Sequence, residues 1–146
     1  MKLVGLRQGK VKPEDKDLNQ LIFEVAEHRQ ENDIEEIYKR LSRLELFAPV
    51  MSANFEIEHG QSMTIEKGME LKIPTTMIQG LTFATYFVNK NDPRLGDSFM
   101  GISVSEAFDM VDKTTDLAGL AFYNDRDSYF GIARQDFATL RSRYLA

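Results

Sequence analysis

A short polar stretch at residues 124–128, with the sequence NDRDS, separates two apolar runs. Asp125 and Asp127 have the alternating spacing of the first ligands in a calcium loop, which also needs an oxygen ligand at its fifth position and glycine at its sixth. Counted from Asp125, these positions hold Tyr129 and Phe130. Because Asn, Asp and Ser are common turn residues, the stretch is predicted to be the turn of a β-hairpin and not a metal site.

Two serines lie where an apolar run meets a helical pattern. Gly101 and Ser103 match the first half of the G-x-S-x-G motif of α/β-hydrolases, but Ser105 stands where the second glycine is required. Glu106 follows Ser103 by three residues, which is the spacing of a capping box. We therefore expect Ser103 to cap a helix. A serine hydrolase using Ser103 or Ser105 is the less favoured alternative.

The other side chains suited to catalysis or metal binding are sparse. The chain has two histidines, His28 and His59, and no cysteine. A serine hydrolase would need one of the histidines as its base. Glu24 and His28 are four residues apart and could share one helix face as metal ligands, but the sequence indicates no further ligands for a metal ion. The absence of cysteine excludes disulfides, thiolate nucleophiles and cysteine-bound metals. No catalytic residue, cofactor or metal is predicted.

The bulk composition is that of one globular domain. The chain has 146 residues, of which 42% are hydrophobic and 28% charged, with a formal net charge of −5. An acidic balance argues against a nucleic-acid partner, because such binding depends on Lys and Arg neutralising phosphates. No apolar run approaches the ~20 residues that cross a bilayer. The first residues also lack the apolar stretch of a secretion signal, so a cytoplasmic protein without membrane association is expected.

Two N-terminal helices are predicted from apolar residues that recur with a helical period. The apolar positions are Leu18, Leu21, Ile22, Val25 and Ala26 for the first helix, and Ile34, Ile37, Tyr38, Leu41 and Leu44 for the second. Asp17 is positioned to start the first helix. Asp33 and Glu36 resemble a capping box for the second, and Glu36 is spaced to pair with Arg40. Residues 1–16 are expected to form a loosely ordered leader.

Strand patterns dominate the rest of the chain. Short strands are predicted at 46–51, with Pro49 at an edge or rim, and at 70–74, 81–88 and 99–102, with a loop at 89–97. A helix at 103–111, a strand pair around residues 124–128 and a closing helix at 134–144 follow. Residues 52–68 fit a hairpin or an extended loop. This order predicts one α+β domain, 1–146, with a mostly antiparallel sheet, two N-terminal helices, one internal helix and a C-terminal helix.

The aromatic residues suggest an interaction surface. The chain has ten Phe and five Tyr residues. Neighbours on a strand point to opposite faces, so each of the pairs Tyr86/Phe87, Phe122/Tyr123 and Tyr129/Phe130 directs one ring away from a one-sided core. Either a further layer covers these outward rings or they contact a partner. We take Tyr86, Tyr123 and Tyr129 as the candidate partner surface.

The order of segments resembles the N-terminal domain of the SseB-like (enhanced serine sensitivity) family. Residues 18–44 followed by 46–50 (LFAPV) resemble its opening helical pair and strand. Residues 81–85 (LTFAT), the helix at 103–111 and the strand at 117–124 (LAGLAFYN) are similar to later parts of that domain, and 132–137 fits its closing strand and helix. Asp125 stands where the family has proline. The family has no established catalytic residues, so the resemblance implies a non-enzymatic role.

These observations favour a non-enzymatic cytoplasmic binding or regulatory module, of SseB-like bacterial type, that acts through a surface of its sheet on a protein partner. The first alternative is a small acidic chaperone that forms a homodimer and binds an extended client. The serine hydrolase is the second.

Overall fold

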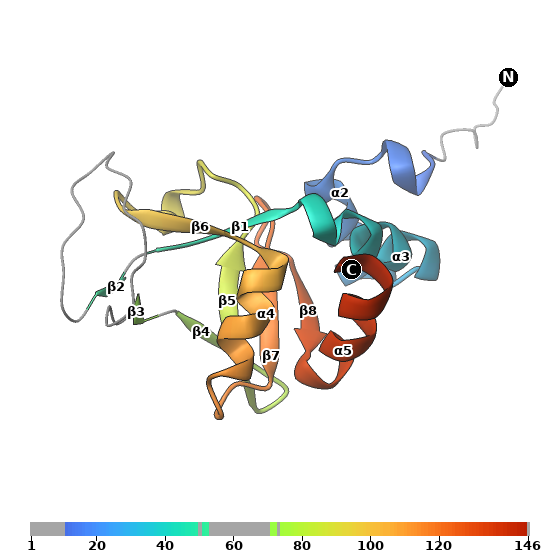
Figure 1. Cartoon of the computed structure of the whole chain (residues 1–146). Coiled ribbons are helices and arrows are strands. Elements are labelled where there is room, and N and C mark those ends of the chain that lie inside the picture. Colours follow the sequence, from blue (N-terminus) through green and yellow to red (C-terminus); the bar gives the residue numbers. More distant parts are fainter. Residues whose placement is uncertain (1–10, 50, 53–70, 73, 146) are drawn as a thin grey trace, which may run out of the picture.

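The structure is a computed structural model that describes residues 11–49, 51–52, 71–72 and 74–145, which form a single α+β domain (Figure 1). The α-helices are α2 (Leu18–His28), α3 (Glu31–Arg40), α4 (Val104–Asp112) and α5 (Phe137–Leu140), and a π-helical turn, η5 (Arg141–Leu145), extends α5. The short 3-10 turns are η1 (Pro13–Asp15), η2 (Leu41–Arg43), η3 (Pro93–Leu95) and η4 (Arg134–Asp136). The strands are β1 (Glu45–Pro49), β2 (Met51–Ser52), β3 (Leu71–Lys72), β4 (Thr75–Ile78), β5 (Leu81–Phe87), β6 (Phe99–Ser103), β7 (Gly119–Tyr123) and β8 (Tyr129–Ala133).

The main sheet has six strands in the order β6-β1-β5-β7-β8, with β4 beside the first half of β5. Its pairings are antiparallel except that of β5 with β7, which are parallel from Phe83 beside Gly119 to Phe87 beside Tyr123. The chain passes between these two strands through β6 and α4, the long connection that a parallel pair requires. β2 and β3 form a separate pair. The predicted α+β class with a mostly antiparallel sheet is confirmed.

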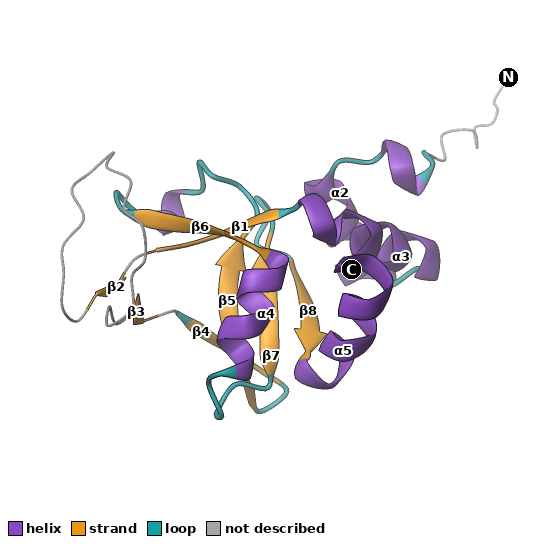
Figure 2. Ribbon diagram, viewed as in Figure 1, coloured by secondary structure: helices purple, strands orange, loops and turns teal. Residues whose placement is uncertain are grey.

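One hydrophobic core joins the four α-helices to the main sheet. In Figure 2, α4 lies in front of β5 and β7, while α2, α3 and α5 are grouped beside β8. Alternate residues of each strand face these helices. The sheet contributes Leu46, Ala48, Ala84, Tyr86, Leu120, Phe122, Phe130 and Ile132, and the helices contribute Leu21, Ile22, Val25, Ile37, Val104, Ala107, Phe108, Val111, Phe137 and Leu140. Burying one large apolar side chain stabilises the fold by about 1.5–3 kcal/mol, so this core supplies the main driving force.

The first helix begins as the sequence predicts, but the second does not. Asp17 caps α2, its carboxylate accepting the N–H of Gln20 at 2.8 Å. The predicted capping box of Asp33 and Glu36 is wrong, because α3 already begins at Glu31 and Asp33 lies inside it, buried. The pair of Glu36 with Arg40 is confirmed at 2.8 Å.

A partly buried ion network explains the position of Asp33. The ammonium of Lys16 lies 2.7 Å from Glu24 on α2 and 3.1 Å from Asp33 on α3. The hydrogen bond from Lys16 holds the pKa of Glu24 below its ordinary value. The network fixes the two helices to each other and holds residues 11–16 against them. The leader prediction is therefore wrong for residues 11–16, while residues 1–10 lie outside the described residues.

The strand predictions hold with small shifts. Pro49 is the last residue of β1, at the rim of the sheet, where its missing N–H is tolerated. The predicted strand at 70–74 corresponds in part to β3, and the prediction for 52–68 lies outside the described residues from residue 53 onward. Strand β4 was not expected. It is joined to β5 by the two-residue turn Gln79-Gly80, whose φ angles of 52° and 82° are those of a type I′ hairpin.

Candidate functional site

The face of the main sheet opposite the helices, called here the helix-free face, carries no charge over four strands. Because directly paired residues share a face, its members follow from strand register. They are Thr76 and Ile78 of β4, Leu81, Phe83, Thr85 and Phe87 of β5, Gly119, Ala121 and Tyr123 of β7, and Tyr129 and Gly131 of β8. A sheet face exposed to water is expected to carry polar residues, which alternate along each strand with the apolar residues that face the core. Most of this face is covered within the domain, since Phe83, Thr85, Phe87 and Ala121 are buried and both Leu95 and the guanidinium of Arg94 pack on Phe87. Only the residues of the face that remain exposed can form a contact surface.

Two large side chains of the helix-free face are open to solvent. Leu81 is 56% exposed and Tyr129 is 38% exposed. Tyr123 is half-buried, with its ring centroid 5.4 Å from that of Tyr129. Phe83 and Phe87 are buried below them. The exposed part of the face, called here the patch, consists of Leu81 at the start of β5 and of Tyr123 and Tyr129, which lie in register with Phe87 at the end of β5.

Tyr86 is not part of that patch, which corrects one of the three predicted partner residues. Its side chain is fully buried in the helix-side core, where it lies in register with Phe122. The outward ring of the pair Tyr86/Phe87 is that of Phe87. Burial raises the pKa of Tyr86 well above its ordinary value, and its hydroxyl has no hydrogen-bond partner among the described residues.

The buried hydroxyl leads to a testable expectation. An unpaired buried polar group costs free energy, so Tyr86→Phe should leave the stability unchanged or raise it by up to about 1 kcal/mol. Tyr86→Ala, which creates a cavity, should cost about 3–5 kcal/mol. Urea denaturation of the three proteins measures both effects. A loss of more than about 1 kcal/mol in Tyr86→Phe would mean that the hydroxyl has a partner, such as an internal water.

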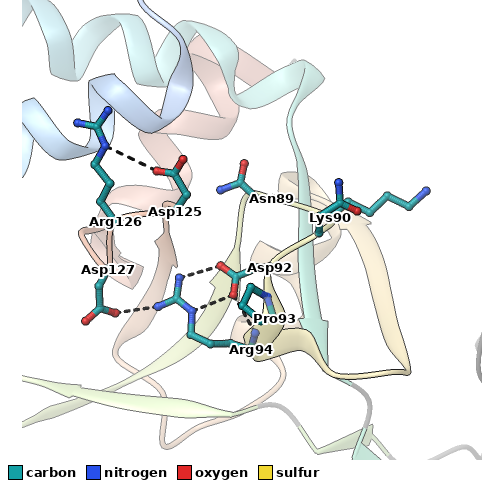
Figure 3. A pocket seen from close by; sticks show the side chains of 9 residues that line it. Asn89, Lys90, Asp92, Pro93, Arg94, Asp125, Arg126 and Asp127 are labelled. Atoms are coloured by element: carbon teal, nitrogen blue, oxygen red, sulfur yellow. Dashed lines mark hydrogen bonds and ion pairs between the residues drawn. The ribbon is translucent and has the colours of Figure 1, made fainter.

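A second feature lies where the parallel strands β5 and β7 end. In open α/β sheets ligands bind outside the carboxyl ends of parallel strands. Here the segments that follow β5 and β7 enclose a groove of about 530 Å³ (Figure 3). It is lined by Asn89, Lys90, Asn91, Asp92, Pro93, Arg94, Asp125, Arg126 and Asp127. In Figure 3, Lys90 and Arg126 point away from each other, so the groove does not concentrate positive charge.

Arg94 joins the two sides of this groove. Its guanidinium donates to both oxygens of buried Asp92, at 2.9 and 2.7 Å, to Asp127 at 2.7 Å and to the carbonyl of Asn124 at 2.8 Å. It also lies 4.6 Å from the ring centroid of Phe87, on the helix-free face. The hydrogen bond from Arg94 lowers the pKa of Asp92, whose carboxylate therefore stays ionised. These hydrogen bonds use the donor groups of Arg94 and link the segment after β5 to the turn after β7.

The polar stretch at residues 124–128 is the predicted hairpin turn, because Tyr123 pairs with Tyr129 on either side of it. Asn124 is fully buried and organises the turn: its amide oxygen accepts the N–H groups of Arg126 and Ser128, both at 2.9 Å, and its amide nitrogen donates to the carbonyl of Asn19 at 2.9 Å. Within the described residues, no three His, Asp or Glu side chains lie close enough together to hold a metal ion.

The serine candidates have a structural explanation. The hydroxyl of Ser103 accepts the N–H of Glu106 at 3.1 Å, and the carboxylate of Glu106 accepts the N–H of Ser103 at 2.9 Å. The predicted capping box at the start of α4 is thus confirmed. Ser105 is exposed in the first turn of α4, and His28 is exposed at the end of α2. His59 lies outside the described residues.

Removing the capping hydroxyl should have a modest and specific cost. Ser103→Ala is expected to lower the free energy of unfolding by about 1 kcal/mol, because one N–H at the start of α4 loses its acceptor. Ser105→Ala should change it by less than about 0.5 kcal/mol. Thermal denaturation of both variants tests this. Equal effects of the two substitutions would contradict the capping role.

The comparisons with known proteins return no match: no family model, no curated protein and no solved structure matches this chain. The resemblance to the SseB-like family therefore stays a prediction. In the part of the chain that the structure describes, no helix is long and apolar enough to span a membrane.

Sequence reasoning missed Leu81 and Arg94. Leu81 directly follows the Gln79-Gly80 turn, and recognising that turn as a hairpin would have placed Leu81 at an exposed strand end. A local sequence pattern indicates only the contact of Arg94 with Asp92, because Asp92 and Pro93 form the start of a 3-10 turn. Its contacts with residues 124 and 127 come from the fold.

Proposed function

We propose that this protein is a non-enzymatic binding or regulatory module that recognises a protein partner through the patch of Leu81, Tyr123 and Tyr129. The observation that carries the proposal is the helix-free face, on which four strands present no charge and two large side chains are open to solvent. Aromatic residues in such patches give large contact areas at low entropic cost. A cytoplasmic location and an SseB-like type of role are part of this proposal.

The groove and the serines give less support to an enzyme. The hydroxyl of Ser103 serves the helix cap, and the guanidinium of Arg94 is occupied by Asp92, Asp127 and a carbonyl. A nucleophile needs a base within hydrogen-bond reach. Neither Ser103 nor Ser105 has a histidine among its hydrogen-bond partners within the described residues.

The test is affinity capture from the source cell with three tagged proteins: the wild type, Leu81→Asp and Ser105→Asp. Both substitutions place a carboxylate at an exposed site, but only the first lies on the patch. A protein captured by the wild type and Ser105→Asp, and lost with Leu81→Asp, supports the proposal. Its affinity, measured with purified components, should fall at least about tenfold in Leu81→Asp. A partner that binds all three proteins equally contradicts it.

A further inference from the structure

Met77 on strand β4 has the most accessible sulfur among the described side chains. It is 64% exposed, the largest exposed fraction of any large hydrophobic residue that the structure describes. Met100 and Met110, the other methionines whose side chains belong to the described part of the chain, are half-buried. Because an oxidant has to reach a thioether in order to react with it, exposure decides which methionine of a folded protein is oxidised first.

The hydroxyl group of Thr82 covers one side of this sulfur. It donates a hydrogen bond to Sδ of Met77 at 3.3 Å. The two residues are directly paired between β4 and β5 and therefore share a face of the sheet. A thioether sulfur can be attacked from either of two sides, and each side gives a different epimer of the sulfoxide. At Met77 the side toward β5 carries the Thr82 hydroxyl, and the opposite side is open to solvent.

The sulfur chemistry of the chain is restricted to methionine. The chain has seven methionines and no cysteine, so no thiolate competes for an oxidant. Hydrogen peroxide transfers one oxygen atom to a thioether. The sulfur lone pair attacks one peroxide oxygen, the S–O bond forms, the O–O bond breaks, and the proton of the attacked oxygen leaves with the hydroxide as water. Sulfur is oxidised to the sulfoxide and the peroxide is reduced, so no further reactant is needed.

We propose that Met77 is a modification site, at which hydrogen peroxide adds one oxygen to the solvent side of the sulfur and forms one sulfoxide epimer in excess. The new S=O group points to water, so the hydrophobic core is not disturbed. The modification turns an exposed apolar side chain into a polar one, and stereospecific reductases can reverse it. This inference does not depend on the proposed function, because it is measured on the purified chain without a partner.

The rates of oxidation test the site. Digestion at lysine releases residues 73–90, in which Met77 is the only methionine, and residues 91–113, which contain Met100 and Met110. After brief treatment with dilute hydrogen peroxide, mass spectrometry should show that Met77 reacts at least about fivefold faster than the other two. In concentrated urea the three rates should agree within about twofold, because unfolding exposes every sulfur. Equal rates in the folded chain, or the same difference in urea, would overturn the proposal.

The ratio of the two epimers tests the role of Thr82. Two classes of methionine sulfoxide reductase each reduce one epimer, so treatment of the fragment 73–90 with each enzyme gives the ratio. The wild type should yield one epimer in at least about threefold excess, and Thr82→Ala should yield about equal amounts, because both sides of the sulfur are then open. Thr76→Ala is the matched control and should keep the excess, since Thr76 lies in register with Phe83 on the helix-free face.

Two outcomes of the epimer experiment would contradict the proposal. Equal amounts of the two epimers in the wild type would show that Thr82 does not shield the sulfur. The same excess in the wild type and both variants would show that another feature sets the ratio. Circular dichroism verifies that the variants are folded, and the wild-type ratio decides the question if Thr82→Ala is not.

Discussion

Replacing Arg94 by alanine is expected to lower the free energy of unfolding by about 2–4 kcal/mol. The substitution leaves Asp92, whose side chain is 3% exposed, without its counter-ion. A buried charge that loses its partner typically costs 3–5 kcal/mol, and the lower value expected here reflects that Arg94 itself is 36% exposed. The bonds to Asp127 and to the carbonyl of Asn124 are lost as well. Denaturation with urea at neutral pH measures the effect.

A second substitution separates the charge from the packing. If the unpaired carboxylate is the main cost, then adding Asp92→Asn to Arg94→Ala should recover part of the lost stability, because a neutral amide is easier to bury. Arg94→Lys keeps the charge but not the forked geometry and should be intermediate. A double variant that is no more stable than Arg94→Ala would contradict this explanation.

The same pair predicts how stability depends on pH. The pKa of Asp92 is lowered in the folded state, mainly by the hydrogen bond from Arg94. Its stabilising contribution is therefore complete above the ordinary pKa of about 3.9, and it is lost as the pH falls through the lowered value. The difference in stability between the wild type and Arg94→Ala should shrink below about pH 4. Denaturation curves between neutral and acidic pH measure it, and a difference that stays constant would be inconsistent with this linkage.

Gly119→Ala should also destabilise the protein strongly, by at least about 2 kcal/mol. A Cβ atom at this position would lie 2.1 Å from the carbonyl oxygen of Ile132 and 2.9 Å from Cε2 of Phe83. The first contact is with backbone, which a change of side-chain rotamer cannot relieve. β7 would have to move away from β8, next to the parallel pairing with β5. Thermal and urea denaturation measure the loss.

Gly131→Ala is the matched control on the neighbouring strand. A Cβ atom there would approach Ile78 no closer than 3.9 Å, and the φ angle is not positive. Since glycine weakens a strand by its flexibility, alanine should be neutral or stabilise the protein by up to about 1 kcal/mol. Similar losses in the two variants would show that the close approach at Gly119 is not the cause.

Much of the fold could be predicted because its signals are local. The helical stripes of α2 and α3, the capping box at Ser103 and the turn after Tyr123 depend on residues a few positions apart. Asp33 was misassigned for the opposite reason. Its spacing to Glu36 fits a cap, but its partner is Lys16, 17 positions earlier, and only the folded chain brings them together.

The candidate surface could be predicted only in part. The alternation of side chains along a strand correctly indicates that Tyr86 and Phe87 point to opposite faces of the sheet, so that one of them lies outside the helix-side core. It does not indicate which one. Both faces of β5 are apolar, with Ala84 and Tyr86 on one and Phe83 and Phe87 on the other. The choice depends on where the helices pack. No local pattern in the sequence indicates on which face of β5 the helices pack.

The hydrogen bond from Asn124 to the carbonyl of Asn19 spans 105 positions of the chain. The side chain of Asn19 also accepts the N–H of Asp125 and bonds to Asn89, so the start of α2 holds both loops at the end of the parallel pair. A growing chain cannot complete this arrangement until residue 125 has been synthesised. Helix α2 and the hairpin of β7 and β8 consequently belong to one cooperative unit, and long-range closure of this kind is a slow step in folding.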